Sequence, residues 1–370
     1  MTQVAEGVCM ICAIQLWELS PSYSPTHTNE NTPPDWNPFK WREDNILLSG
    51  PTWPAEGKGP TSTAIPEENV TVQKAHIYNR SQATISSTGL KVNIQIKNIP
   101  KQHPSYSLND GPRWYLCLHA ACETLARKAM NTRLRARLAF DEGILVPLCL
   151  PHVPNNKPGK PIELGVERYY IPWQAICTEE SVLDDWSQEW WNHNPLDIPH
   201  LTEALVSNLE RVEPSSTHKQ FNTSLNNLPP EIEETITSFL IEGCISLECT
   251  YLMPQSRWKD IIFQIPFLRD LEKDIIEAKE QEAVSGSFEW NWEKLVRQVL
   301  SEVPIFVSND DDELENPWSY QTFGLTVPMG FTNRRRIWQI LVDMYPNDVG
   351  MVHCLDEEDE DQDYDQDEET

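Results

Sequence analysis

Two short motifs, more than a hundred residues apart, constrain the fold of this chain more than any other feature. The first is Cys9-x-x-Cys12 and the second is His119-x-x-Cys122. A spacing of two residues lets both donors of a pair face one tetrahedral ion, so each motif has the form of half a zinc site. If one ion binds both halves, the N-terminal segment must fold back onto the region around residue 120. The sequence therefore predicts a structural zinc ion with four protein ligands and no open position for water.

Other interpretations of these thiols stay open. Free cysteine is often a small buried hydrophobe, and a Cys-x-x-Cys pair is also a redox motif, although no thioredoxin-like strand–helix pattern surrounds this one. Cys117 is a spare thiol that would serve in place of either ligand of the second half. The first residues of the chain contain neither a basic segment nor a long apolar core, so we expect no signal peptide. Nine cysteines in such a chain indicate thiols or metal ligands rather than a disulfide framework.

The residues between the two motifs predict a small sheet beside a helix. Lys91–Lys97 alternates polar and apolar residues, which is typical of a half-buried strand. Weaker strand patterns lie at 70–72 and 83–85, and a helix is expected over Ala120–Leu138. The stretch Pro21–Pro66 is rich in Pro, Ser, Thr and Asn and is expected to be irregular, with its tryptophans pinning a long loop.

A second pattern lies near the middle of the chain. The run from Leu228 to Leu240 has apolar residues at helical spacing, so one face of the predicted helix is apolar. Pro229 and Pro230 suit the first turn of a helix, where an N–H has no intrahelical partner. The acidic residues that follow match the positive end of the helix dipole. A further helix is predicted around Trp258, after a break.

This arrangement resembles the F-box, which has an opening Pro-Glu-Ile and a later Arg-Trp step; here these are 230–232 and 257–258. Met253–Ser256 stands in place of the usual Cys-Lys-Arg element. The Cys-x-x-Cys pair, a Leu-His-x-x-Cys motif at 118–122, the central F-box and an Asn-Arg-x-Arg-Ile-Trp helix at 333–338 also follow one another in this order. In that respect the chain resembles a group of large filamentous-fungal F-box proteins.

The resemblance implies the substrate-recognition subunit of a cullin–RING ubiquitin ligase, which binds a Skp-type adaptor and an unidentified protein substrate. Such a subunit has no catalytic residues of its own and acts by holding a substrate close to the conjugating enzyme. The implied adaptor contacts are Leu228, Pro229, Pro230, Ile232, Ile236, Leu240 and Trp258. An alternative is a zinc-stabilised protein-interaction scaffold with a degenerate F-box and no role in a ligase.

An enzyme that depends on the metal or on a thiol is a third and weaker alternative. The sequence has no Gly-rich phosphate loop, no dinucleotide fingerprint, no His-Glu-x-x-His and no Gly-x-Ser-x-Gly. We therefore expect the chain not to be an enzyme.

Taken together, the patterns predict an α+β chain in five parts. These are a zinc-stapled N-terminal α/β module (1–150), a connecting segment with a Trp-rich helix (151–225), the F-box helices (226–272), a mainly helical C-terminal region (273–350) and a disordered acidic tail (351–370). The tryptophans of Ser181–Trp191 are expected in the core, or else on a recognition surface. The arginines at 334–336 are expected to bind an acidic partner, or to pair with Asp310–Glu315 or the tail.

The net charge of the chain disfavours some classes of binding partner. The net charge of −28 opposes binding to nucleic acid or to anionic membranes. From Asp356 to the C-terminus nearly every residue is Asp, Glu or Gln, and such a run repels itself and buries no core. No apolar run is long enough to span a membrane. We therefore expect a cytoplasmic or nuclear protein.

Overall fold

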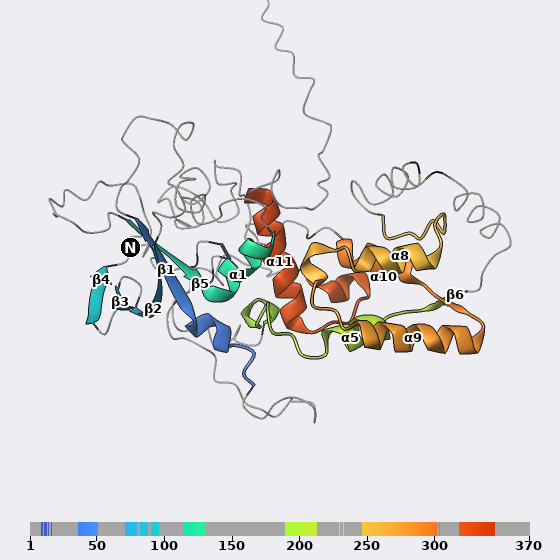
Figure 1. Cartoon of the computed structure of the whole chain (residues 1–370), viewed down its shortest axis with the longest axis horizontal. Coiled ribbons are helices and arrows are strands. Elements are labelled where there is room, and N and C mark those ends of the chain that lie inside the picture. Colours follow the sequence, from blue (N-terminus) through green and yellow to red (C-terminus); the bar gives the residue numbers. More distant parts are fainter. Residues whose placement is uncertain are drawn as a thin grey trace, which may run out of the picture.

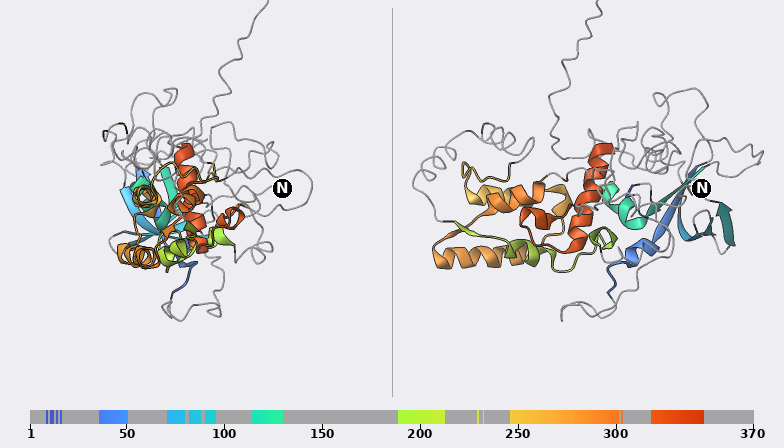
Figure 2. Two further views of the ribbon diagram at one scale, coloured as in Figure 1. Left: turned by 90° about the vertical axis from the view of Figure 1, so that its right-hand side faces the viewer. Right: turned by 180° about the vertical axis from the view of Figure 1, so that it is seen from behind.

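The computed structural model describes the following residues of the chain: 9, 11–12, 14, 16, 36–50, 71–79, 82–87, 90–95, 114–129, 189–212, 229, 232, 246–301, 303 and 318–344. These residues form a mixed structure of helices and strands that is mostly helical. A sheet lies at one end of the long axis and α8 (Gln255–Ile262), α9 (Lys273–Gly286) and α10 (Trp292–Leu300) lie at the other. Helix α11 (Met329–Met344) stands between them (Figure 1), and the same order is visible from behind (Figure 2).

The sheet has five antiparallel strands in the order β4-β3-β2-β1-β5. Their bounds are Asn45–Gly50 for β1, Thr71–Asn79 for β2, Gln82–Ser87 for β3, Leu90–Gln95 for β4 and Trp114–His119 for β5. Strands β2 to β4 form a meander, whereas β1 lies between β2 and β5 and pairs with both. The β1–β5 register sets Asn45 opposite His119. The last residue of β5 is therefore fixed beside the first residue of β1.

The sequence predicted part of this sheet. Strand β4 contains residues 91–95 of the expected strand Lys91–Lys97, and residues 71–72 and 83–85 of the weak patterns belong to the longer strands β2 and β3. Residues 70, 96 and 97 lie outside the described residues. Strands β1 and β5 were not predicted. The stretch that was expected to be irregular, Pro21–Pro66, contains β1, and β5 immediately precedes the second metal motif.

The remaining elements are short helices and one small sheet. Their bounds are Ala120–Ala129 for α1, Leu201–Ser207 for α5, Lys40–Glu43 for η2, Trp190–Asn192 for η5, Pro266–Leu268 for η6, Tyr320–Phe323 for η7, Arg211–Val212 for β6 and Glu289–Trp290 for β7. The η elements are 3-10 helices, and β6 pairs antiparallel with β7. In η5, Trp190 and Trp191 are 5% and 2% exposed, which confirms the core interpretation for these two tryptophans. Residues 181–188 of the expected Trp-rich helix lie outside the described residues.

The region around α9 and α10 is helical with short breaks. The chain leaves helical geometry between Leu268, where η6 ends, and Lys273, where α9 begins. Strand β7 directly precedes the cap of α10, which becomes helical at Trp292. Asn291 caps α10, since its side chain accepts a hydrogen bond from Lys294 N.

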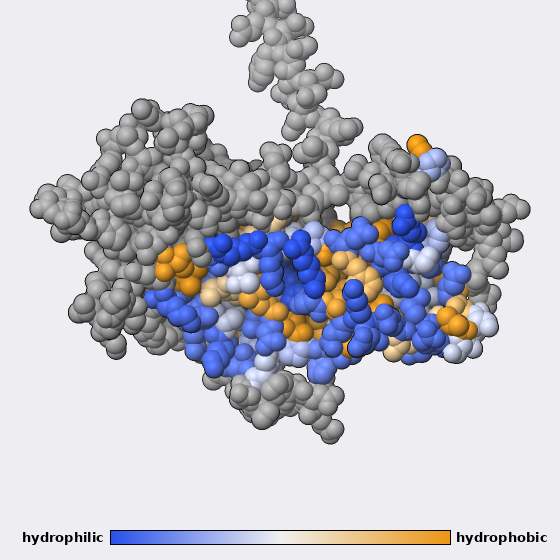
Figure 3. Space-filling view, viewed as in Figure 1, coloured by the Kyte–Doolittle hydropathy of each residue, from blue (hydrophilic) through white to orange (hydrophobic). Residues whose placement is uncertain are grey.

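Helix α11 is the centre of the packing. Every residue from Gly330 to Val342 is buried, so the helix is covered on all sides and not on one face alone. It packs against η5, α1 and η6. Hydrophilic residues cover much of the surrounding surface, and apolar residues gather near the middle of the view (Figure 3). The described part of the chain has no helix that is both long and apolar enough to cross a membrane.

The three arginines of α11 are buried, contrary to expectation. Arg334 makes paired bonds of 2.7 Å to the two oxygens of Asp270. Arg335 donates to the carbonyl of Ser301 at 3.0 Å, and Arg336 donates to the carbonyl of Cys12. With exposures of 3%, 0% and 0%, these side chains do not present a basic surface to an acidic partner. The segment 310–315 and the tail lie outside the described residues.

A buried carboxylate organises the packing of α8 against α10. Glu293 is fully buried and accepts hydrogen bonds from Thr250 N at 2.7 Å and Tyr251 N at 2.8 Å. It also forms an ion pair with Arg297 at 2.9 Å. The guanidinium of Arg297 lies 5.1 Å from the ring centroid of Trp258 in α8. The loop before α8 is thereby attached to α10 by charge-assisted hydrogen bonds.

Candidate metal centre

Four metal-ligating side chains meet at one buried point. The ligand atoms of Cys9, Cys12, His119 and Cys122 all lie within 4.8 Å of one another, and all four residues are fully buried. The Cys12 Sγ is 3.3 Å from the His119 Nδ1. The prediction that the two half-sites come together is confirmed.

Each half-site is positioned by local structure. In the first half, the N–H of Cys9 donates to the carbonyl of Ile14 at 2.8 Å, which closes a turn around Cys12. The side chain of Asn45 donates to the carbonyl of Leu16 at 2.9 Å and so attaches this turn to β1. The first half-site is therefore held against the sheet that carries the second.

The second half-site spans a change from strand to helix. His119 is the last residue of β5, and Cys122 lies in the first turn of α1. The helix predicted over Ala120–Leu138 is present as α1 from Ala120 to Ala129, so it begins directly after His119; residues 130–138 lie outside the described residues. The N–H of Ala120 donates to the carbonyl of Asp44 at 2.8 Å, which fixes the start of α1. The side chain of the spare thiol, Cys117, lies outside the described residues.

The three thiols lie close enough together to shift one another's pKa values. Burial alone would raise the pKa of Cys9, but hydrogen bonds with Cys12 and Cys122 and the charge of His119 outweigh it, so this pKa falls well below the usual thiol range. Burial raises the pKa of Cys12, and burial together with both neighbouring sulfurs raises that of Cys122. Three thiolates at this spacing repel one another unless a cation lies among them.

Two further residues, which the sequence did not point to, complete the surroundings. The ring of Trp41 lies 4.7 Å from that of His119. Arg336 is buried and donates to the carbonyl of Cys12. Burial lowers the pKa of Arg336 below its ordinary value, although the charges of Cys12, Cys122 and Cys9 act in the opposite direction. The centre thus lies where β5, α1, α11 and the turn that carries Cys9 and Cys12 meet.

The residues expected to contact an adaptor are only partly described. Pro229 is exposed, and Ile232 is 48% exposed with its N–H bonded to the carbonyl of Pro229 at 3.0 Å. Trp258 is fully buried in the core that α8 shares with α10, so its side chain is not available to a partner. The others lie outside the described residues: Leu228, Pro230, Ile236 and Leu240.

Comparisons with known proteins found no match: no family model fits the chain, and no curated protein or solved structure is similar to it.

Proposed function

We propose that Cys9, Cys12, His119 and Cys122 bind a structural zinc ion. The observation that carries this proposal is the convergence of four donors from two distant segments, with their ligand atoms within 4.8 Å. Three thiolates and one imidazole form a typical tetrahedral zinc set, and such an ion would neutralise the crowded sulfurs. Four protein donors leave no position for a substrate or a water nucleophile. The ion would therefore stabilise the fold and not take part in catalysis.

Neither of the other interpretations of the thiols accounts for the whole arrangement. Small buried hydrophobes have no reason to surround an imidazole that is itself fully buried. The described cysteines of the cluster are free thiols, and a redox pair would not need a third thiol and His119 at the same point. A metal ion explains all four side chains at once.

Elemental analysis of the purified chain tests the zinc proposal. We expect one zinc ion per chain, and we expect Cys122→Ala to lose it. Cys249→Ala is the matched control, because Cys249 is a half-buried cysteine that lies outside the cluster, in the loop before α8. Wild-type protein without metal, isolated without chelator, would overturn the proposal.

For the chain as a whole, we propose a non-enzymatic substrate receptor that binds a Skp-type adaptor through the F-box-like region 228–271, with its apolar contacts in 228–240. The sequence resemblance carries this proposal, and the exposure of Pro229 and Ile232 supports it, since an adaptor needs an apolar face that the chain does not cover itself. Trp258 would then stabilise the core that α8 shares with α10 and would not contact the adaptor.

Copurification with the adaptor tests the receptor proposal. Ile232→Asp combined with Ile236→Asp should abolish binding, because two charges would have to be buried in an apolar interface. Val284→Asp is the control, since Val284 on α9 is 72% exposed and belongs to no expected contact. If the wild-type chain fails to bind under conditions in which an F-box protein binds, the receptor proposal is wrong.

A zinc-stabilised scaffold with a degenerate F-box is the second candidate. The burial of Trp258 and its contact with Arg297 favour it, because they give the second half of the F-box-like segment a role inside the chain's own core. This candidate predicts a bound zinc ion and no adaptor. Copurification with the adaptor therefore separates it from the receptor.

A further inference from the structure

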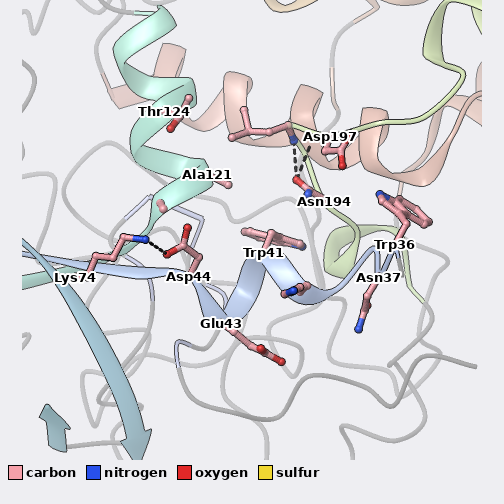
Figure 4. A pocket seen from close by; sticks show the side chains of 13 residues that line it. Trp36, Asn37, Trp41, Glu43, Asp44, Lys74, Ala121, Thr124, Asn194 and Asp197 are labelled. Atoms are coloured by element: carbon pink, nitrogen blue, oxygen red, sulfur yellow. Dashed lines mark hydrogen bonds and ion pairs between the residues drawn. The ribbon is translucent and has the colours of Figure 1, made fainter. Parts of the chain in front are cut away.

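A cavity of about 760 Å³ opens beside the metal centre. Its lining comes from residues 36–44, Lys74 of β2, the first turns of α1 and the turn 194–197 (Figure 4). Four segments that are distant in sequence therefore meet around it. Its size falls within the range of about 300–1,000 Å³ that is usual for ligand pockets.

The base of the cavity is held firmly. Trp41 is only 5% exposed, its indole N–H donates to the carbonyl of Asn192 at 2.7 Å, and its ring packs on His119. The N–H of Ala120 donates to the carbonyl of Asp44. Trp41 occupies the middle of the view in Figure 4, with the Asp44–Lys74 pair on one side and Trp36 on the other. The metal centre thus supports the base of this cavity.

The charges around the cavity favour a cation. Three carboxylates (Glu43, Asp44 and Asp197) line it against two ammonium groups (Lys40 and Lys74), which leaves a net charge of 2 − 3 = −1. Asp44 and Lys74 lie 3.8 Å apart and offset each other. Indole rings attract cations through their π faces, and the net charge of −28 on the whole chain adds to the attraction.

The side-chain amides of Asn37 and Asn194 add hydrogen-bond donors to the cavity. The Oδ1 of Asn37 accepts from the N–H of Phe39 at 2.8 Å, and that of Asn194 accepts from Leu196 N at 2.9 Å and Asp197 N at 3.2 Å. These bonds orient both side chains. Each amide nitrogen keeps two N–H donors, for which no acceptor is found in the described part of the chain. A carbonyl oxygen is the acceptor that such donors match.

We propose that this cavity binds a short peptide segment that presents an arginine or lysine side chain. The cation would lie above the base formed by Trp41, near the indole of Trp36 and the carboxylates of Glu43 and Asp197, and backbone carbonyls would accept from Asn37 and Asn194. An anionic ligand would be repelled by the net charge, and a purely apolar one would leave the carboxylates and amides unpaired. Assigning this peptide to a ligase substrate rests on the receptor function proposed above, whereas peptide binding itself does not.

Three capped seven-residue peptides test the proposal, identical except for Arg, Gln or Glu at the central position. Binding to the zinc-loaded full chain is followed through the indole N–H signals of ¹⁵N-labelled tryptophan. We expect the Arg peptide to shift a small subset of these signals and to bind more tightly than the Gln peptide. The Glu peptide should bind most weakly, and added salt should weaken the Arg peptide selectively.

Variants assign the binding to the cavity. Asp197→Asn and Glu43→Gln should each weaken the Arg peptide by about two- to five-fold, as expected for exposed ion pairs. Glu277→Gln changes the charge equally but lies on the exposed surface of α9, so it should leave binding unchanged. Unshifted indole signals elsewhere would show that each variant is folded.

The proposal would be overturned by equal or tighter binding of the Glu peptide, or by the absence of a shift with any of the peptides at millimolar concentration. Equal effects of Glu277→Gln and Asp197→Asn would place the binding elsewhere and would also overturn it. None of these measurements involves the adaptor, so their failure is distinguishable from failure of the receptor function.

Discussion

The guanidinium of Arg336 in α11 donates a hydrogen bond to the backbone carbonyl of Cys12, which lies 324 positions earlier in the sequence. The side chain of Arg336 is fully buried beside the three thiols. A zinc ion with three thiolates carries a net charge of 2 − 3 = −1, which a buried guanidinium offsets. Helix α11 and the N-terminal turn that carries Cys9 and Cys12 therefore stabilise each other.

Arg336→Met should weaken zinc retention by about 10- to 100-fold, which is typical for loss of a residue that supports metal ligands from behind. It removes both the hydrogen bond to Cys12 and the compensating charge. Competition with a colorimetric chelator measures the effect. Arg336→Lys keeps the charge and should retain more of the affinity than Arg336→Met.

Arg269→Met is the matched control, because Arg269 is exposed and lies away from the cluster. It should leave zinc affinity unchanged. If Arg336→Met binds zinc as tightly as the wild type does, Arg336 has no part in the centre, although the zinc proposal would stand.

The sequence predicted the cluster of four metal-ligating side chains because each half carries suitable residue types at a fixed spacing. Local sequence patterns do not reveal the residues that bring the two half-sites of the cluster together. Asn45 belongs to a short strand inside the Pro-rich stretch Pro21–Pro66, and β1 has no strong alternation over Asn45–Gly50. Strand β5 ends inside the second motif, at His119, and it was not predicted.

The arginines of α11 were misjudged for a different reason. A run of three charged residues ordinarily marks a solvent-exposed helix face. Here, the partners are backbone carbonyls and Asp270, which come from segments that only the tertiary fold brings close. Burial of charge depends on such partners, and a single sequence does not show them.

Glu293→Ala should lower the free energy of unfolding by about 3–5 kcal/mol, because it leaves the buried cation of Arg297 without its partner. It also removes the acceptor of Thr250 N and Tyr251 N. Urea unfolding followed by tryptophan fluorescence measures the change.

Glu277→Ala, at an exposed position of α9, is the control and should change the unfolding free energy by less than about 0.5 kcal/mol. Equal effects of the two variants would show that the buried carboxylate does not organise the packing of α8 against α10.

Gly330→Ala should destabilise the chain by about 1–3 kcal/mol, since a methyl group there overfills a closed contact. A Cβ at this position would lie 2.2 Å from the carbonyl oxygen of Asn194 and 3.2 Å from a side-chain carbon of Ile198. The turn 194–197 would have to move, so peptide binding in the adjacent cavity should also weaken. Met329→Ala, at the exposed start of the same helix, should affect neither property.

Tyr320 should make stability fall at alkaline pH. Burial raises the pKa of Tyr320 above its ordinary value of 10.0, although the neighbouring Arg335 acts in the opposite direction, and its hydroxyl donates to the carbonyl of Val299 at 2.8 Å. With a folded pKa above the unfolded one, the stabilisation is complete below about pH 10. It is lost as pH rises further, because the unfolded state releases the proton first.

Tyr320→Phe removes this contribution and about 1 kcal/mol of hydrogen bonding at neutral pH. The difference in unfolding free energy between the wild type and Tyr320→Phe should therefore shrink, or change sign, between about pH 9 and about pH 11. Urea titrations of both proteins across this range measure the difference. A difference that stays constant with pH would mean that the phenol of Tyr320 ionises equally in the folded and unfolded chains, which is incompatible with the closed packing of η7 against α10.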